Sequence, residues 1–466
     1  MTAAAPPAER AAPPRNARPP SPAPPGSVDP RTWGTVILCA IVAGAAATVW
    51  MWLQDTHGGS LRTLGDELTA AGRLTGLVGA YLVVIEVLLI ARIRPIERLV
   101  GLDRLARWHS RNGQYVISLL VVHTLATIAG YAATDHISLA TETSHVVLHY
   151  PDVLAATVSL ALFAAVGVTS ARIARRRLAY HQWYFVHLYT YLAVVLAFAH
   201  QFATGDDFVG HPAHRVLWAL FHVGALTLLL AYRVVAPVRL SMRHQLRVVA
   251  VERAGPDVVS VRVAGRDVVA LGAHAGQFFL WRFLTPQGWW QSHPFSLSEA
   301  PDGRTLRITV KETGDLTRWL TELPLGTSVM VEGPFGTLTA GRRTRTKVLL
   351  LAGGIGVTPL RALFEAMPAA PGDVTFLYRV GRREDLVLRD ELEALAQQRG
   401  ARLLYAAGSR RQRDPLAPAS LQRAVPDLAE HDVFVCGSPS FVDHASASLV
   451  AAGASPDHIH AEKFEL

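Results

Sequence analysis

Six apolar segments before residue 240 place the strongest constraint on how this chain can fold. They lie near residues 32–53, 75–92, 113–133, 151–170, 184–203 and 214–236. Each approaches the roughly 20 residues that a helix needs to cross a bilayer core. Because lipid offers no partner to backbone N–H and C=O groups, such segments cross membranes as helices. The sequence therefore predicts an all-α bundle of six transmembrane helices, followed by a half with the composition of a soluble protein.

Charged residues alternate in sign along the connections between these segments. Arginines gather before the first segment, between the second and third, between the fourth and fifth, and after the sixth: Arg10, Arg15, Arg18, Arg31, Arg92, Arg94, Arg98, Arg104, Arg107, Arg172, Arg175, Arg176, Arg177, Arg239, Arg243 and Arg247. The other connections are mainly acidic: Asp55, Asp66, Glu67, Asp135, Glu142, Asp152, Asp206 and Asp207. This positive-inside pattern predicts a multi-pass protein of the cell (plasma) membrane with both termini in the cytoplasm. It accounts for the net charge of +8 without a nucleic-acid partner.

The N-terminal residues and the cysteines set limits of another kind. Residues 1–30 are rich in alanine and proline, and we interpret them as a disordered cytoplasmic tail. The run at 32–53 is too long for a signal-peptide core, so we interpret it as a retained helix. Cys39 and Cys436 lie in different predicted compartments, which excludes a disulfide framework.

Histidines occur in pairs in the third and fifth segments. His109 and His123 are fourteen positions apart, which is roughly 21 Å along a helix and returns to nearly the same face. The fifth segment contains His187 and His200. Ionisable side chains are costly inside a membrane and usually have a functional partner. Two imidazoles from each helix could bind two haem irons stacked across the bilayer.

The spacing in the fifth segment fits this prediction less well. His187 and His200 are thirteen positions apart, which misses the same face of an ideal helix by about 140°. An irregular turn between them would be required. The alternative is that these histidines cap helices or form hydrogen bonds within the bundle. We interpret the remaining histidines of the outer connections and the sixth segment as structural: His136, His145, His149, His211, His214 and His222.

After residue 243 the pattern changes to short β-rich runs, then to alternating strands and helices. The first set, separated by Gly, Pro and Asp turns, predicts a small antiparallel barrel or sandwich. The second set, from about 345, predicts a parallel nucleotide-binding sheet. Its first turn is GGIGVTP, with Gly353, Gly354, Gly356, Val357, Thr358 and Pro359. Such a turn can bind a pyrophosphate at a helix N-terminus, although many strand–helix turns need glycine for steric reasons alone.

Five motifs occur in the order typical of the ferredoxin–NADP reductase superfamily. They are HPFSLSEA at 293–300, VKETGDLT at 310–317, GPFG at 333–336, GGIGVTP at 353–359 and VCGSP at 435–439. With six apolar segments and paired histidines in front, the chain resembles the ferric reductase and NADPH oxidase family over about residues 32–466. The resemblance implies a transmembrane domain at 31–240, an FAD-binding domain at 241–342 and an NAD(P)-binding domain at 343–466.

The resemblance also implies roles for individual residues. The flavin motif is His293, Pro294, Phe295 and Ser296, and the segment with Lys311, Gly314 and Thr317 matches the cradle of the FAD pyrophosphate. Cys436 and Gly437 match the pair beside the nicotinamide, and Phe464 matches the terminal aromatic residue that covers the flavin. Taken singly, Cys436 could equally be a buried small hydrophobe and Phe464 an anchor for the chain end.

The implied activity is transmembrane electron transfer from NADPH through FAD and two b-type haems to an outer acceptor, either dioxygen or a ferric chelate. A reductase serving a protein or quinone is the alternative, and a haem-free transporter or sensor is the non-enzyme alternative. The arginines expected to favour NADPH are Arg379, Arg382 and Arg383, joined by Ser409 and Arg410. Arg73 is expected beside the outer haem, where it would stabilise a propionate or superoxide, or else extend to the interface as a structural residue.

Overall fold

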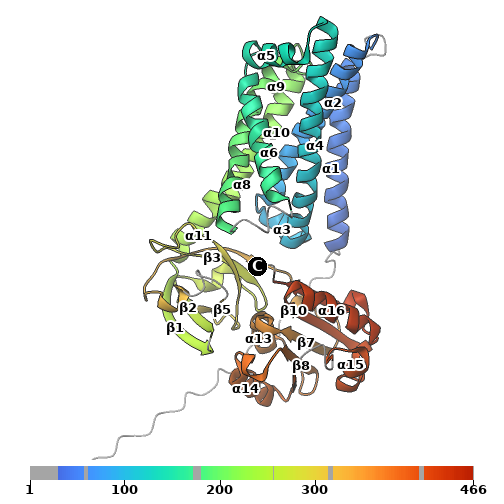
Figure 1. Ribbon diagram of the computed structural model, residues 1–466. Helices are drawn as coiled ribbons and strands as arrows, with labels where there is room; N and C mark the ends of the chain where they lie inside the picture. The colour runs from blue at the N-terminus through green and yellow to red at the C-terminus, as the bar shows by residue number, and fades with distance from the viewer. Residues whose placement is uncertain are drawn as a thin grey trace, which may run out of the picture.

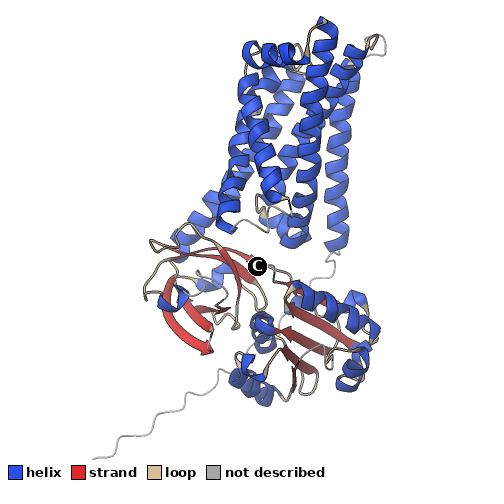
Figure 2. Cartoon of the chain, in the orientation of Figure 1, coloured by secondary structure: helices blue, strands red, loops and turns tan. Residues whose placement is uncertain are grey.

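The computed structural model describes residues 30–56, 61–171, 180–255, 257–312, 319–408 and 414–464. Figure 1 shows a bundle of long helices joined at one end to two sheet-containing domains that lie next to each other. Figure 2 shows that the strands are confined to these two domains. The predicted order of a helical bundle, an antiparallel domain and a parallel domain is confirmed.

Within the described residues, six helical stretches are long and apolar enough to cross a membrane. The helices are α1 (Pro30–Asp55), α2 (Leu64–Ile90), α4 (Leu102–Asp135), α6 (Val153–Ser170), α8 (Tyr180–Leu196) with α9 (Phe198–Thr204), and α10 (Pro212–Leu230) with η2 (Ala231–Val235) and α11 (Ala236–His244). Two shorter helices, α3 (Arg94–Val100) and α5 (Leu139–His149), lie in connections where the sequence analysis expected none. The six predicted spans are confirmed.

Helices α2 and α4 pack closely because small residues line their contact. A Cβ atom added to Gly72 would lie 2.4 Å from the hydroxyl oxygen of Thr127, and one added to Gly76 would lie 2.6 Å from Nδ1 of His123. Small residues allow this approach, which is a common basis for helix association in membranes. The contact places one face of α2 directly against the histidines of α4.

The antiparallel domain consists of two three-stranded sheets, ordered β1-β2-β5 and β4-β3-β6. Its strands are β1 (Arg247–Gly255), β2 (Val258–Ala264), β3 (Phe278–Phe283), β4 (His293–Ser296), β5 (Thr305–Lys311) and β6 (Val329–Phe335). Alternate residues point inward, and Phe279, Trp281 and Ile308 are fully buried between the sheets. This domain follows α11 directly in the chain.

The second domain has a five-stranded parallel sheet in the order β11-β10-β7-β8-β9. Its strands are β7 (Lys347–Gly353), β8 (Val374–Val380), β9 (Arg402–Ala407), β10 (His431–Gly437) and β11 (Ile459–Lys463), and its main helices are α13 (Val357–Ala366), α14 (Arg389–Arg399), α15 (Pro418–Ala424) and α16 (Pro439–Ala451). Helices α13 and α14 cover one face, and α15 and α16 cover the other. Burial on both faces explains the continuous apolar strands.

Candidate functional site

The structure brings His109 of α4 and His187 of α8 together at the end of the bundle nearest the sheet domains. Their ring centroids are 5.9 Å apart and their planes are at 67°. Nδ1 of His109 lies 3.0 Å from a carboxylate oxygen of Glu86 and 3.3 Å from the Glu86 carbonyl oxygen. A partner on Nδ1 leaves Nε2 of His109 available as a metal ligand, which is the usual arrangement around ligating histidines.

His123 lies on the same helix, toward the opposite end of the bundle. Its Nδ1 lies 2.8 Å from the carbonyl oxygen of Gly72, so the Nδ1–H group donates a hydrogen bond to a neutral acceptor. This again leaves Nε2 available. His200, from α9, lies close enough to His123 to interact with it electrostatically. The four histidines therefore form two pairs at different depths.

The irregular turn required between His187 and His200 lies at Ala197, where α8 ends and α9 begins. The hydroxyl group of Ser159 on α6 donates a 2.7 Å hydrogen bond to the carbonyl oxygen of Ala193, which also accepts the bond from the Ala197 N–H. A side chain that competes for a helical carbonyl is a recognised cause of helix distortion. The helix is therefore interrupted between His187 and His200, so ideal-helix spacing does not fix their relative directions.

The histidine pairs fit a metal bound by two imidazoles. Within the described part of the chain, Nδ1 of His187 and Nδ1 of His200 are buried and have no hydrogen-bond partner. If one metal is bound between two imidazoles, the distance between the ring centroids is the sum of two metal–nitrogen bonds of about 2 Å and the two distances from nitrogen to ring centre, about 6 Å in all. The inner pair has its centroids 5.9 Å apart. These residues could hold two haem irons at different depths in the bundle.

Arg73, on α2 beside Gly72, forms ion pairs with both acidic residues of the connection after α9. Its guanidinium contacts Asp207 at 2.7 Å and 3.3 Å, and Asp206 at 3.6 Å. The Asp207 side chain is only 3% exposed. Arg73 is thus one residue from the carbonyl group that fixes His123, but two carboxylates already share its charge. This ion pair did not follow from the sequence, and the placement of Arg73 beside an outer haem stays a prediction.

The predicted flavin motif forms strand β4, which pairs with β3 at one edge of its three-stranded sheet. His293 is largely buried, and burial lowers its pKa to about 4. Its ring lies parallel to that of Phe295 at 6.0 Å, and Ser296 is buried. Lys311 is exposed at the end of β5. Gly314 and Thr317 lie outside the described residues.

Aromatic side chains connect the region of this motif to the inner histidine pair. Trp290, three residues before His293, packs against Phe185 of α8 with ring centroids 5.4 Å apart. Trp183, on the same helix, lies 4.9 Å from the ring of His187. The two domains are also joined by an ion pair between Arg92, after α2, and Glu332 of β6. The flavin motif therefore lies on the side of the antiparallel domain that faces the bundle.

The glycine turn and the residues matched to the nicotinamide site meet at the carboxyl edge of the parallel sheet. Gly354 has a positive φ of 54°, and a Cβ atom on Gly356 would lie 2.3 Å from the Cys436 carbonyl oxygen. Cys436 is fully buried, which raises the pKa of its thiol and keeps it protonated. The N–H of Phe464 donates a 2.9 Å hydrogen bond to the Gly437 carbonyl oxygen.

Two features of this edge limit what the side chains can do. Val357, Thr358 and Pro359 are buried in the first turn of α13, so only their backbone is available to a ligand. Gly353 packs against the ring of Phe441, and a Cβ atom on Gly353 would lie 2.5 Å from that ring. The steric explanation for glycine therefore holds at this position, beside any role in binding.

The arginines predicted to bind a 2′-phosphate differ in their environments. Arg379 is buried near the end of β8, where it donates hydrogen bonds to the carbonyl groups of Ala406 and Gly408. Arg382 is 75% exposed and forms an ion pair with Glu384 at 2.7 Å. Exposed pairs of this kind contribute little to stability, so Arg382 can turn toward a ligand. Ser409 and Arg410 lie outside the described residues.

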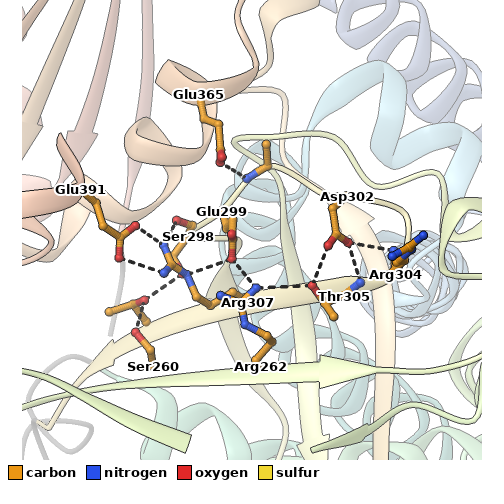
Figure 3. A network of polar contacts seen from close by, with 12 residues as sticks. Ser260, Arg262, Ser298, Glu299, Asp302, Arg304, Thr305, Arg307, Glu365 and Glu391 are labelled. Atoms are coloured by element: carbon orange, nitrogen blue, oxygen red, sulfur yellow. Dashed lines mark hydrogen bonds and ion pairs between the residues drawn. The ribbon is translucent and has the colours of Figure 1, made fainter. Parts of the chain in front are cut away.

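A network of charged side chains joins the two sheet-containing domains (Figure 3). Arg307 of β5 forms two hydrogen bonds, of 2.9 Å and 2.7 Å, with the carboxylate of Glu391 on α14. Arg361 of α13 contacts the same carboxylate at 2.8 Å. Burial alone would raise the pKa of Glu391, but these arginines outweigh it and lower the pKa. The network fixes the flavin motif relative to the nucleotide-binding edge and was not predicted from the sequence.

Three family models match successive parts of the chain. A ferric reductase-like transmembrane component matches residues 75–198, an FAD-binding domain matches 243–339, and an oxidoreductase NAD-binding domain matches 350–447. The three matches follow the bundle, the antiparallel domain and the parallel domain in order. The predicted family is therefore confirmed, together with an NAD(P)H-dependent flavin oxidoreductase activity.

Several known proteins are similar to about half of this chain. Ferredoxin–NADP reductase B of Sorangium cellulosum is 30% identical over 241 residues, which cover 47% of this chain and 97% of that protein. The glycine betaine monooxygenase reductase subunit of Chromohalobacter salexigens is 28% identical, over 48% of this chain and 64% of that protein. The 3-ketosteroid-9-alpha-monooxygenase ferredoxin reductase component of Mycolicibacterium smegmatis is 31% identical, over 41% of this chain and 55% of that protein. The chain thus spans somewhat over half of the last two relatives.

Among solved structures, the FAD/NAD-binding domain of a nitric oxide dioxygenase from Vibrio cholerae is 22% identical. The match covers 47% of this chain and 98% of that chain, with a TM-score of 0.39.

Proposed function

The chain belongs to the ferric reductase and NADPH oxidase family, and from this membership we propose that it carries electrons from NADPH through FAD and two b-type haems to a small diffusible acceptor. It is a multi-pass membrane protein that takes electrons from NAD(P)H by way of FAD. Our proposal adds the haems, the preference for NADPH, the class of acceptor, and a plasma-membrane location with both termini in the cytoplasm.

The observation that carries the proposal is the depth-matched pairing of four histidines. His109 faces His187, and His123 lies with His200 farther along the same helices. One pair alone could be a structural contact between helices. Two pairs, with unpartnered Nδ1 atoms in the described part of α8 and α9, support two metal centres in series. A hydrocarbon layer of about 30 Å requires redox centres within it, because it is too thick for one useful electron transfer.

The residues between the flavin motif and the inner pair support transfer into the bundle. Trp290 contacts Phe185, and Trp183 contacts His187, so packed aromatic rings line the junction between the domains. When bound, the haems would supply one-electron chemistry, and the protein would supply placement and electrostatics. His109 and His123 would each ligate through Nε2, while Glu86 and the Gly72 carbonyl group orient the rings.

At the carboxyl edge of the parallel sheet, the backbone rather than the thiol of Cys436 would bind the nucleotide. The N-terminus of α13 and the glycine turn would receive the pyrophosphate, and Arg382 would meet the 2′-phosphate. Cys436 would act through its position beside Gly437, because a buried, protonated thiol is a poor nucleophile. Phe464, tethered to Gly437 through its N–H group, would cover the flavin until nicotinamide enters.

The acceptor that we favour is dioxygen, by a small margin over a ferric chelate. The outer connections contain no cysteine pair, and Arg73 provides a fixed positive charge close to the backbone that holds His123. Against dioxygen, Thr127 stands where oxidases often have a histidine one turn beyond the outer ligand. A protein or quinone partner remains the alternative acceptor.

The decisive experiment is a visible spectrum of the purified protein before and after addition of NADPH under anaerobic conditions. Reduced bis-imidazole haem gives a sharp α band, and we expect two haems per chain. Admission of air should then reoxidise the haems and produce superoxide in proportion to the NADPH consumed. An absence of haem would overturn the proposal, and turnover that needs an added protein or quinone would overturn the proposed acceptor.

The preference for NADPH has its own test. We expect kcat/KM for NADPH to exceed that for NADH, and Arg382→Ala to lower the NADPH value by about tenfold, which is the loss of one charge-assisted contact of about 1.4 kcal/mol. The NADH value should change little. Arg389→Ala, on the exposed start of α14, is the matched control. Equal kcat/KM values for the two nucleotides in the unaltered protein would contradict the preference.

A further inference from the structure

We propose that Asp55, His211 and His214 form a binding site for a divalent transition-metal cation at the end of the bundle remote from the sheet domains. Asp55 is the last residue of α1, and His211 and His214 lie at the start of α10. These residues are 156 and 159 positions from Asp55, so only the fold brings them together. The sequence analysis treated both histidines as structural.

The ligand atoms are already grouped at a distance that a metal could bridge. One carboxylate oxygen of Asp55 and one ring nitrogen of each histidine all lie within 4.8 Å of one another. Nε2 of His211 is 3.2 Å from Oδ1 of Asp55, and the two imidazole rings are parallel with centroids 5.2 Å apart. Ligands about 2.1 Å from a tetrahedral metal lie about 3.4 Å from one another, so small side-chain rotations would complete the site.

Two further features prepare these side chains to bind a metal. Nδ1 of His214 lies 3.1 Å from the carbonyl oxygen of Asp207, which only accepts hydrogen bonds. His214 is therefore protonated on Nδ1 and presents the lone pair of Nε2, as ligating histidines usually do. Among the atoms that the structure describes, Oδ2 of Asp55 is buried without a hydrogen-bond partner. A buried carboxylate oxygen of this kind is stabilised by a cation.

The surrounding charges also favour a cation. Asp55, Asp206 and Asp207 all lie close enough to the guanidinium group of Arg73 to interact with its charge. Arg73 forms its ion pairs with Asp207 and Asp206, whereas the Asp55 carboxylate lies beside the imidazole of His211. The partial negative charge at the C-terminus of α1 adds to the attraction, while the N-terminus of α10 opposes it.

The donor set determines the class of metal. Two imidazole nitrogens and one carboxylate oxygen suit Zn²⁺, Co²⁺, Ni²⁺, Fe²⁺ or Cu²⁺, whereas Mg²⁺ and Ca²⁺ prefer oxygen ligands alone. The side chain of His211 is 44% exposed and that of Asp55 is 14% exposed. An ion could therefore enter from the surface past His211, and water would complete its coordination. The bound ion would join the end of α1 to the start of α10.

The test uses the full-length, haem-containing protein in lipid nanodiscs, freed of adventitious metal with a chelator. Zn²⁺ is titrated by calorimetry, bound zinc is counted by mass spectrometry after gel filtration, and Mg²⁺ is the negative control. We expect one Zn²⁺ per chain and a higher melting temperature with Zn²⁺. His214→Ala and Asp55→Asn should each weaken binding by at least tenfold and abolish the rise in melting temperature.

The matched control is His149→Ala, since His145 and His149 form another exposed histidine pair in the same region of the bundle. Binding in this variant should equal that of the unaltered protein. If zinc binding is undetectable, survives in His214→Ala and Asp55→Asn, or is lost in His149→Ala, the proposed site is wrong. The haem spectrum of each variant shows whether it has folded, and His214→Gln replaces His214→Ala if it has not. A negative result would leave the proposed electron path untouched, because none of these residues lies on it.

Discussion

The inner and outer histidine pairs differ in the chemistry that surrounds their imidazoles. His109, in the inner pair, has the carboxylate of Glu86 3.0 Å from its Nδ1 atom. His123, in the outer pair, has only the neutral carbonyl group of Gly72 at 2.8 Å. A carboxylate partner makes an imidazole a stronger donor to iron and so stabilises the ferric state. If both pairs bind haem, the inner haem should therefore have the lower reduction potential. Electron transfer from the inner to the outer haem would then release free energy.

The strongest way to break this comparison is to remove one histidine from each pair. We expect His123→Ala to lose the outer haem and keep most of the inner one, so that the haem content per chain falls by about half. His109→Ala should lose the inner haem and also stop the reduction of the outer haem by NADPH. Haem is measured by the pyridine haemochrome spectrum, and NADPH-driven reduction by the α band.

The control for both variants is His222→Ala, because His222 is half-buried in α10 but bonds to the Trp218 carbonyl oxygen in its own helix. It should keep both haems. Retention of two haems in His123→Ala, or loss of both in His222→Ala, would contradict the assignment of ligands.

A second variant, Glu86→Gln, sharpens the comparison. The amide keeps the size of the side chain and removes its charge, so the imidazole of His109 becomes a weaker donor. A change of about 1 kcal/mol in the relative stability of ferric and ferrous iron corresponds to about 40 mV in a one-electron potential. We expect the inner potential to rise by about that amount and the outer potential to stay constant, as measured by spectroelectrochemical titration.

Asn112 provides a control for this variant, because its side chain donates a 2.7 Å hydrogen bond to Oε2 of Glu86, whereas His109 lies beside Oε1. Asn112→Ala should shift the inner potential less than Glu86→Gln. If both potentials move together, or neither moves, the proposed gradient does not arise from Glu86.

A third variant tests how the second helix presents its histidines. Ser159→Ala removes the hydroxyl group that bonds to the Ala193 carbonyl oxygen beside the turn at Ala197. A lost buried hydrogen bond costs about 1 kcal/mol, and His200 lies beyond the turn whereas His187 lies before it. We expect a lower melting temperature and weaker retention of the outer haem only. Thr157→Val, on the exposed face of α6, is the control. Equal loss of both haems would show that the turn does not depend on Ser159.

Periodicity and motif order predicted the fold because they report on burial. Lipid requires long apolar helices, and a doubly covered parallel sheet requires continuous apolar strands, so both appear as composition along the chain. The helices α3 and α5 escaped prediction because they are short and lie in polar connections. The position of the turn at Ala197 also escaped prediction, because no local Gly or Pro marks it in the sequence.

In the helical bundle, the candidate site could be predicted only where the spacing of residues within one segment indicated a shared helix face. His109 and His123 share a helix face, so their spacing was informative. Glu86 also left a signal, since an acid within an apolar segment usually has a specific partner. The pairing of Arg73 with Asp207, the joining of Arg307 to Glu391, and the metal-binding cluster left none. Each connects residues more than 80 positions apart, which only the tertiary structure brings together.

His293 extends the comparison of imidazole environments to the flavin motif. Its Nε2 atom has only a distant contact, 3.4 Å from the Gln291 side-chain oxygen, and burial lowers its pKa to about 4 from an unfolded value near 6.5. Below pH 6.5 the unfolded chain binds a proton that the folded chain does not, so folding stability falls as the pH drops from 6.5 to 4. We expect the melting temperature of the antiparallel domain to decline across this window. His293→Gln should decline less, while His274→Gln, an exposed histidine of the same domain, should match the unaltered protein. Equal slopes in all three proteins would show that His293 is already solvated, and that the flavin motif is more open than its burial indicates.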